Sequence, residues 1–122
     1  MSRKLESSDA EERREAAIDL GRTGKGAVPL LLRALGDTDW RVRKTAVEGL
    51  VALGDDEVTN GLVQRLSAED NAGARNSAIE ALVQIGAAAV DPILSLLSTR
   101  DPDVRKFAVD VLGDIRDTRA VP

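Results

Sequence analysis

The sequence has no cysteine and no histidine, and its 122 residues include one tryptophan, one phenylalanine and no tyrosine. Without cysteine the chain can form neither a disulfide framework nor a thiolate metal site, and without histidine it lacks the commonest metal ligand and general base. Its carboxylates are spread along solvated faces, and it has no glycine-rich phosphate loop or nucleophile elbow. We therefore predict that the protein is not an enzyme and has no catalytic residue, no cofactor and no metal site.

Aromatic residues make up only 2% of a chain that is 43% hydrophobic, so Ala, Val, Leu and Ile have to fill the interior. This composition suits closely packed helices. The 21 acidic residues outnumber the 17 Lys and Arg residues, and a net charge of −4 argues against a phosphate-backbone partner. We therefore expect no nucleic acid among the partners.

Long hydrophobic runs are also missing. The N-terminus has no apolar signal-peptide segment, and no run approaches the ~18 apolar residues that a membrane span needs. We expect no membrane association and a cytoplasmic location.

What the chain does contain is a repeated unit, clearest in residues 39–54, DWRVRKTAVEGLVALG. When the copies are aligned, successive units are separated by 30, 32 and 30 residues. The aligned alanines are Ala16, Ala46, Ala78 and Ala108, and the aligned leucines are Leu20, Leu50, Leu82 and Leu112. A period of about 31 residues built from two amphipathic segments is typical of a helical solenoid, in which each unit buries its apolar side only against its neighbours.

The long segment of each unit has helix signals at both ends. An acid or amide recurs where a side-chain oxygen can cap the first turn, and a glycine recurs where a left-handed residue can stop the helix. The predicted capping residues are Asp9, Asp39, Asn71 and Asp101, and the predicted stops are Gly24, Gly54 and Gly86.

The second helix of each unit is shorter and keeps a period of 31 residues, as in Leu31, Leu62 and Ile93 and in Leu35, Leu66 and Leu97. The middle copy contains Gly61, which costs up to ~1 kcal/mol of helix stability relative to alanine. We therefore expect the middle short helix to be the least regular.

These signals divide the chain into a flexible N-terminal segment, 1–8, and a single repeat domain, 9–122. The approximate unit bounds are 9–36, 37–67, 68–98 and 99–122, the last of which is truncated, so that there are about three and a half helix pairs. Residues 119–122 match residues 26–29, three periods earlier, so the fourth long helix lacks a covering short helix. We expect either a piece of a longer array or self-association through this uncapped repeat.

The motif DxxVRxxAVxxLxxxG of the second unit, DPDVRKFAVDVLGDI of the fourth and GAVPLLLRAL of the first resemble short HEAT-like repeats of the phycobilisome-lyase type, from Asp9 onward. The resemblance implies an all-α, right-handed, armadillo-like superhelix used mostly for protein binding, with the second helices on the inner surface. Some relatives assist bilin attachment or phycobilisome turnover. HEAT-like di-iron hydroxylases need His–Glu pairs, which a chain without histidine cannot supply.

Arginine recurs four residues after each capping residue, at Arg13, Arg43, Arg75 and Arg105. These side chains either form a basic ladder for an anionic ligand or make ion pairs between units. We favour the ion pairs, because positions repeated in every unit usually serve the stacking that every unit shares.

Trp40 breaks the repeat, since the equivalent positions hold Ala10, Ala72 and Pro102. It is either a binding anchor or a side chain that lies over an adjacent turn and Arg43.

The solvent side of the short helices forms a second candidate surface that is low in acids. Its residues are Leu30, Arg33, Ala34, Gln64, Arg65, Ser95 and Leu96. They predict a groove for a protein or an extended peptide, although Leu30 and Leu96 could instead pack into the next unit.

We therefore predict a non-catalytic protein-binding scaffold that holds a protein or extended peptide along its short-helix face. The alternative is an accessory subunit of a phycobilin lyase or a phycobilisome-turnover factor.

Overall fold

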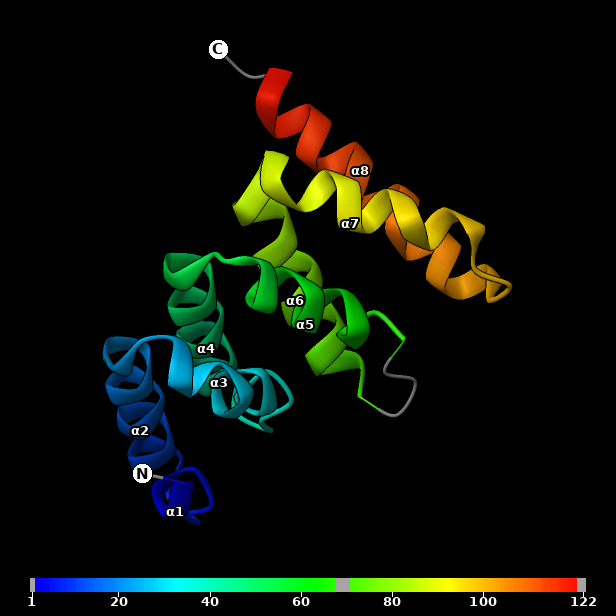
Figure 1. Ribbon diagram of the computed structural model, residues 1–122. Helices are drawn as coiled ribbons and strands as arrows, with labels where there is room; N and C mark the ends of the chain where they lie inside the picture. The colour runs from blue at the N-terminus through cyan, green and yellow to red at the C-terminus, as the bar shows by residue number, and fades with distance from the viewer. Residues whose placement is uncertain (1, 68–70, 121–122) are drawn as a thin grey trace.

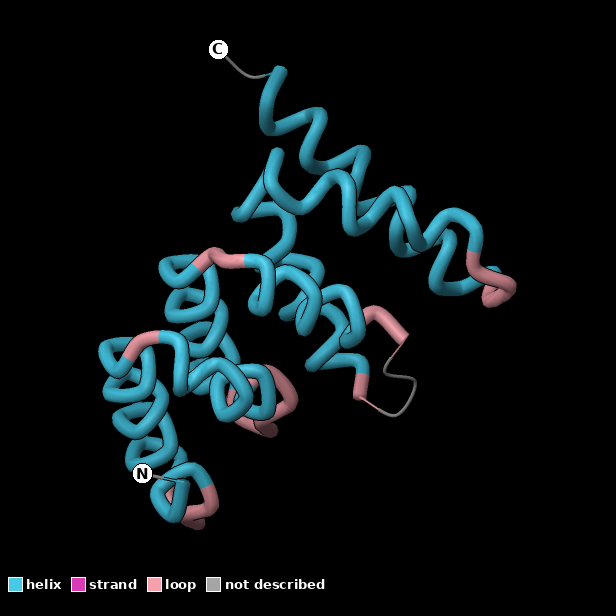
Figure 2. Tube along the Cα trace, in the orientation of Figure 1, coloured by secondary structure: helices cyan, strands magenta, loops and turns pink. Residues whose placement is uncertain are grey.

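The computed structural model describes residues 2–67 and 71–120, with the side chains described over 4–67 and 71–116. These residues form helices joined by short turns, and the described part contains no strand (Figure 2). The α-helices are α1 (Ser2–Leu5), α2 (Ala10–Thr23), α3 (Val28–Ala34), α4 (Trp40–Leu53), α5 (Asp56–Arg65), α6 (Ala72–Ile85), α7 (Val90–Leu94) and α8 (Pro102–Ala120). Three 3₁₀ turns, η1 (Lys25–Ala27), η2 (Gly86–Ala89) and η3 (Ser95–Ser98), flank the short helices.

The helices stack as two layers of a solenoid (Figure 1). The long helices α2, α4, α6 and α8 pack side by side in one layer, and α3, α5 and α7 form the other. The two termini lie at opposite ends of the stack (Figure 1). The predicted all-α solenoid is confirmed, and its right-handed sense stays a prediction.

The core lies between the two layers and consists of the periodic residues. Leu50 and Leu82 of the long helices and Leu31, Leu62 and Ile93 of the short helices are fully buried. Full burial of a leucine stabilises the fold by about 2 kcal/mol. Because each layer covers the other, this stabilisation depends on the units being stacked.

The predicted caps are confirmed. In each long helix the capping side chain accepts a hydrogen bond from a backbone N–H of the first turn, at 2.8–2.9 Å. Gly54 ends α4 in the left-handed conformation, with φ 50° and ψ 23°. Gly24 and Gly86 also have positive φ, 99° and 73°, but their ψ values lie outside the left-handed helical region.

The prediction that the middle short helix is the least regular is wrong. α5 is a continuous α-helix of 10 residues, whereas α3 has 7 and α7 has 5 between two 3₁₀ turns. Asp55 caps α5 by accepting from the N–H of Val58 at 2.9 Å. Gly61 lies so close to Leu32 that a Cβ would clash with the Leu32 Cδ1. Close packing against α3 therefore accounts for this glycine.

The N-terminal segment makes several contacts. Leu5 of α1 is half-buried against the core, the Ser7 carbonyl accepts from Arg13 at 2.7 Å, and the Ser7 hydroxyl donates to Glu12 at 2.6 Å. The flexibility of segment 1–8 stays a prediction, and Met1 lies outside the described residues. The treatment of 9–122 as one domain also stays a prediction.

The stretch Ala72–Ser98 has the length and hydropathy of a membrane span over 27 residues. It is not one straight helix, because α6 ends at Ile85 and the chain turns back into α7 at Gly86. The 14 residues of α6 are fewer than the ~20 that a span needs. The apolar character of this stretch is explained in part by Leu82 and Ile93, which lie in the solenoid core.

Gly61→Ala is expected to lower the free energy of unfolding by about 1 kcal/mol, because the clash with buried Leu32 outweighs the better helix propensity of alanine. Gly113→Ala is the matched control. An added Cβ at Gly113 in α8 meets nothing within 4 Å, so this change should raise stability by ~0.5–1 kcal/mol. Urea denaturation followed by circular dichroism measures both changes. An equal rise in the free energy of unfolding for the two variants would contradict the packing role of Gly61.

Candidate functional site

The recurring arginines hold the loops between units. Arg13, Arg43 and Arg105 each donate from Nη1 to the backbone carbonyl six residues earlier, at 2.7, 2.7 and 2.9 Å. The residue six positions before Arg75 is Glu69, which lies outside the described residues. This repeated contact supports the structural interpretation of the arginine series.

Arg13 also links the first unit to the second. Its Nε donates to Asp37 Oδ2 at 2.9 Å and its Nη2 to Asp37 Oδ1 at 3.3 Å, and both side chains are largely buried. The Asp37 carboxylate raises the pKa of the Arg13 guanidinium above its ordinary value. Asp37 Oδ1 also accepts from the N–H of Asp39 at 2.8 Å, so one carboxylate fixes both the ion pair and the start of α4.

The junction between the third and fourth units lacks this carboxylate. Thr99 stands two residues before the cap Asp101, as Asp37 stands before Asp39, and its hydroxyl accepts from the N–H of Asp101 at 3.4 Å. The buried Nε of Arg75 has no hydrogen-bond partner among the described residues. The Arg75 guanidinium lies 4.7 Å from the ring centroid of Phe107 instead.

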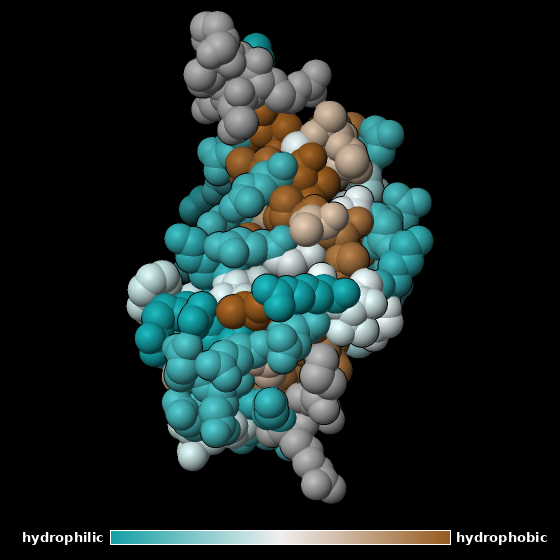
Figure 3. Space-filling model, turned by 90° about the vertical axis from the view of Figure 1, so that its left-hand side faces the viewer, coloured by the Kyte–Doolittle hydropathy of each residue, from teal (hydrophilic) through white to brown (hydrophobic). Residues whose placement is uncertain are grey.

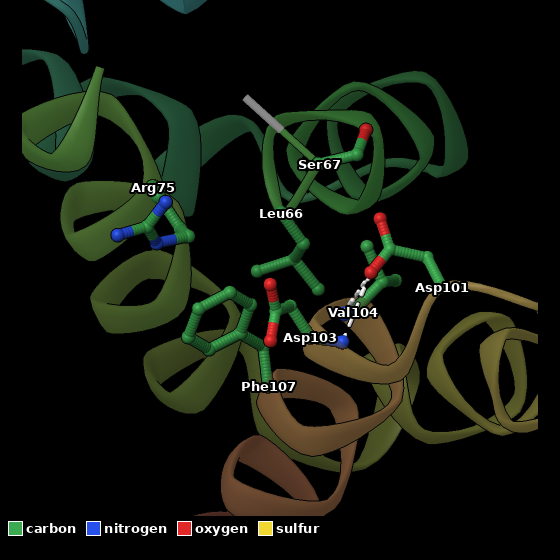
Figure 4. Close-up of a pocket in the computed structure, with 7 residues that line it drawn as sticks. All are labelled: Leu66, Ser67, Arg75, Asp101, Asp103, Val104 and Phe107. Atoms are coloured by element: carbon green, nitrogen blue, oxygen red, sulfur yellow. Dashed lines mark hydrogen bonds between the residues drawn. The ribbon is translucent and has the colours of Figure 1, made fainter. Parts of the chain in front are cut away.

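Arg75 and Phe107 border a hollow of about 520 Å³ between α5, α6 and α8 (Figure 4). Its lining residues are Leu66, Ser67, Arg75, Asp101, Asp103, Val104 and Phe107. Two carboxylates against one guanidinium make it a poor anion site, and Asp101 is engaged in capping α8. Sequence analysis missed this hollow, although the threonine at the place of Asp37 was a visible signal.

Trp40, the first residue of α4, is 61% exposed and separates two shallow hollows of about 380 and 320 Å³. The larger hollow, between α4 and α6, is lined by Trp40, Arg43, Lys44, Gly73, Asn76, Ser77 and Glu80. The smaller, between α2 and α4, is lined by Glu11, Arg14, Trp40, Arg41, Lys44, Thr45 and Glu48. We call the two hollows and the ring between them the Trp40 surface.

Most charges beside Trp40 on the α2 side are paired. Arg14 contacts Glu11 at 2.8 Å, and Arg41 contacts Asp39 at 3.1 Å. The hydrogen bond from Arg14 lowers the pKa of the Glu11 carboxyl, and that from Arg41 lowers the pKa of Asp39. Any stabilisation from these pairs is therefore present at neutral pH and is lost as the pH falls through the lowered pKa values.

The two interpretations of Trp40 can now be compared. The Arg43 guanidinium is bound to the Asp37 carbonyl, and the cation–ring contact found in the described part of the chain is at Phe107. The large exposed fraction of Trp40 favours an anchor over a side chain packed on an adjacent turn.

The predicted short-helix residues differ in accessibility. Arg33, Gln64 and Ser95 are exposed, and Arg65 is half-buried. Arg33 pairs with Glu6 at 3.0 Å, and the Ser95 hydroxyl donates to the Pro92 carbonyl at 2.6 Å.

One of the predicted short-helix residues needs correction, because Ala34 is buried and does not lie on the solvent side. Leu30 and Leu96 are half-buried and pack against the core, in line with the alternative that they serve stacking. The predicted apolar lining of the groove is therefore largely used in stacking. Trp40 lies on the long-helix layer, apart from this face.

The described residues contain no group of three His, Cys, Asp or Glu side chains placed to hold a metal ion.

Comparison with known proteins gives a family match and similar proteins, among them a lyase subunit and a lyase complex. A family model described as HEAT repeats matches residues 2–83 and 60–122. Phycocyanobilin lyase subunit beta of Thermosynechococcus vestitus is 37% identical over 112 residues, covering 89% of this chain and 52% of that protein. The complex of CpcE and CpcF of phycocyanin lyase from Nostoc sp. PCC7120 matches with a TM-score of 0.53 and 26% identity, covering 99% of this chain and 54% of that chain. The chain therefore spans about half the length of these relatives.

Thr99→Asp is expected to raise the free energy of unfolding by roughly 0.5 kcal/mol, because it supplies Arg75 with the carboxylate that Asp37 supplies to Arg13. Thr99→Asn is the matched neutral control and should raise the free energy of unfolding by a smaller amount. Thermal and urea denaturation measure both variants. If the gain from Thr99→Asp is unchanged when Arg75 is replaced by alanine, the pair is not its cause.

Proposed function

Because this chain belongs to the HEAT-repeat family, we propose that it is a non-catalytic scaffold that binds another protein. The observation that carries the proposal is the exposure of Trp40. Residues that serve stacking recur in every unit, whereas the positions equivalent to Trp40 hold Ala10, Ala72 and Pro102. A large aromatic ring that stacking does not require, and that lies in water, is the residue type that most often anchors a partner.

The charges of the Trp40 surface indicate the chemistry of the partner. The two hollows carry four cations and three carboxylates, in a chain with net charge −4; the charged residues are Arg14, Arg41, Arg43, Lys44, Glu11, Glu48 and Glu80. Lys44 borders both hollows and has no ion-pair partner among the described residues. We infer a partner that sets an apolar side chain against Trp40 and a carboxylate near Lys44.

The exposed side of the short helices, with Arg33, Gln64 and Ser95, remains a second proposed contact region. Its positions point away from the core, but its apolar content is small after Ala34 is excluded. We therefore rank it below the Trp40 surface. We also propose a cytoplasmic location.

A second candidate function is that of an accessory subunit in a bilin lyase. It is supported by the 37% identity to a phycocyanobilin lyase subunit beta and by the likeness to the complex of CpcE and CpcF. In this role the solenoid would hold a lyase subunit or the pigment protein through the same surface.

Trp40→Ala is expected to weaken partner binding by roughly 30-fold, the effect of losing a ~2 kcal/mol anchor. Alanine occupies the same position in two other units, so the variant should keep its circular dichroism and melting temperature. Affinity capture from the source organism identifies the partner, and calorimetry with the purified partner gives the dissociation constants. If Trp40→Ala binds the partner fully and the double variant Arg33→Glu/Arg65→Glu does not bind it, the binding surface lies on the short helices.

The lyase role predicts that the purified chain forms a stable complex with purified CpcE or with purified CpcF. Size-exclusion chromatography with light scattering measures the mass of each mixture. Trp40→Ala serves as the comparison variant. Absence of a complex with either protein would count against the lyase role and leave the general scaffold proposal intact.

A further inference from the structure

The two hollows beside Trp40 and the hollow beside Phe107 lie at three successive junctions of the long helices. Their volumes are about 320 Å³ between α2 and α4, 380 Å³ between α4 and α6, and 520 Å³ between α6 and α8. Each is lined by the same two positions of the following long helix, which are Arg41 and Thr45, Gly73 and Ser77, and Asp103 and Phe107. Equivalent positions of stacked units lie side by side in a solenoid. The hollows therefore form a row across the long-helix layer, which we call the row of hollows.

The preceding long helix of each pair contributes equivalent positions as well. Arg14 of the first hollow corresponds to Lys44 of the second. Arg43 of the second corresponds to Arg75 of the third. Each hollow lies between two helices of the stack, so a further unit beyond α2 or α8 would not cover it. The hydrophobic side chains in the upper half of Figure 3 differ in this respect, because they lie at the height of the C-terminal helices, where a further unit would stack.

The row of hollows contains both aromatic residues of the chain. Trp40 borders the first two hollows, and Phe107 borders the third. Phe107 is half-buried and breaks the repeat as Trp40 does, since the equivalent positions hold Glu15, Thr45 and Ser77. Stacking of the units therefore requires neither ring. Because aromatic side chains are common anchors for a partner, the row offers two anchors on one layer.

The middle hollow contains polar side chains without an internal partner. Ser77 is only 7% exposed, yet its hydroxyl makes no hydrogen bond within residues 4–67 and 71–116, and neither does the Asn76 amide. These side chains can bond the N–H and C=O groups of a backbone that does not use them internally. An α-helix does use them internally, so the middle hollow favours an extended occupant.

The balance of charge reverses along the row. The middle hollow has two cations and one carboxylate, whereas the third has one cation and two carboxylates. Lys44 and Asp103 are exposed, and neither has an ion-pair partner in the described part of the chain. A complementary segment therefore carries a carboxylate where it passes Lys44 and a basic side chain where it passes Asp103.

We propose that the row of hollows binds an extended segment of the partner protein. Two apolar side chains of the segment contact Trp40 and Phe107. A carboxylate faces Lys44, and a basic side chain faces Asp103. Packed helices are ~8–10 Å apart, so two helix spacings separate the rings by ~16–20 Å, which an extended chain covers in about five or six residues. The proposal rests on the function proposed above and names the kind of segment that binds there.

Selection of a random 12-residue peptide library, displayed on phage, on the immobilised full chain tests this proposal. We expect enriched sequences to carry an acidic and an apolar residue at one end and an apolar and a basic residue about six positions away. Selection on Lys44→Glu should enrich a basic residue in place of the acid, and selection on Asp103→Arg should enrich an acid in place of the basic residue. Arg41 occupies the position equivalent to Asp103, so the second change suits the fold.

Calorimetry with one enriched peptide measures the contribution of each contact. Trp40→Ala, Phe107→Ser and Asp103→Arg should each weaken binding about tenfold or more. Lys106→Glu is the matched control, because Lys106 is exposed and equivalent to Lys44 but borders none of the three hollows. It should leave the dissociation constant unchanged. Circular dichroism checks that every variant is folded.

Two results would overturn the proposal. One is a selection without enrichment, or with enrichment only of sequences whose apolar residues recur at the three- and four-residue steps of a helix. The other is peptide binding that Trp40→Ala weakens and that neither Phe107→Ser nor Asp103→Arg affects. In that case the Trp40 surface binds a partner that does not extend along the row. The scaffold function would then stand, so the failure of this proposal is distinguishable from the failure of that function.

Discussion

The close approach of neighbouring long helices is the constraint on which the rest of the structure depends. Gly21 of α2 and Gly49 of α4 face each other so closely that a Cβ on either would touch the other's Cα at 3.4–3.5 Å. The small residues Ala46 of α4 and Ala78 of α6 are fully buried in the same layer. This spacing lets leucines of the two layers close over one core, where dispersion and the hydrophobic effect stabilise the stack. It also brings the loop that contains Asp37 within reach of Arg13 in the unit before it and Arg43 in the unit after it.

The sequence was sufficient to predict the features that recur in successive units. Caps, buried leucines and the order of long and short helices follow from spacing alone, and the resemblance to HEAT-like repeats of the lyase type is confirmed by the family match and the relatives. The error at α5 has a clear cause. Helix propensity is a local quantity, whereas Gly61 is placed by a contact with Leu32, which is 29 residues away in the sequence.

The candidate site was harder to predict, because accessibility depends on neighbours that a single unit does not reveal. Ala34 and Leu96 were assigned to a solvent-facing stripe by their period, yet one is buried and the other half-buried. The contact of Arg75 with Phe107 could have been anticipated only by noticing that Thr99 replaces an acid. Trp40 was recognised because it breaks the repeat, which needs no knowledge of packing.

Departures from the repeat are therefore more informative about function here than the repeat itself. Any residue that recurs in every unit has an explanation in stacking, as the arginines do. A residue that differs at one unit has no such explanation, and its environment then has to supply the reason. At Thr99 the reason is a missing ion pair, and at Gly61 it is a close helix contact. Among the described residues, no hydrogen bond or cation–ring contact involves Trp40, and its side chain is 61% exposed. This exposed ring, which the repeat does not explain, is the basis on which we propose that a partner binds at the surface around it.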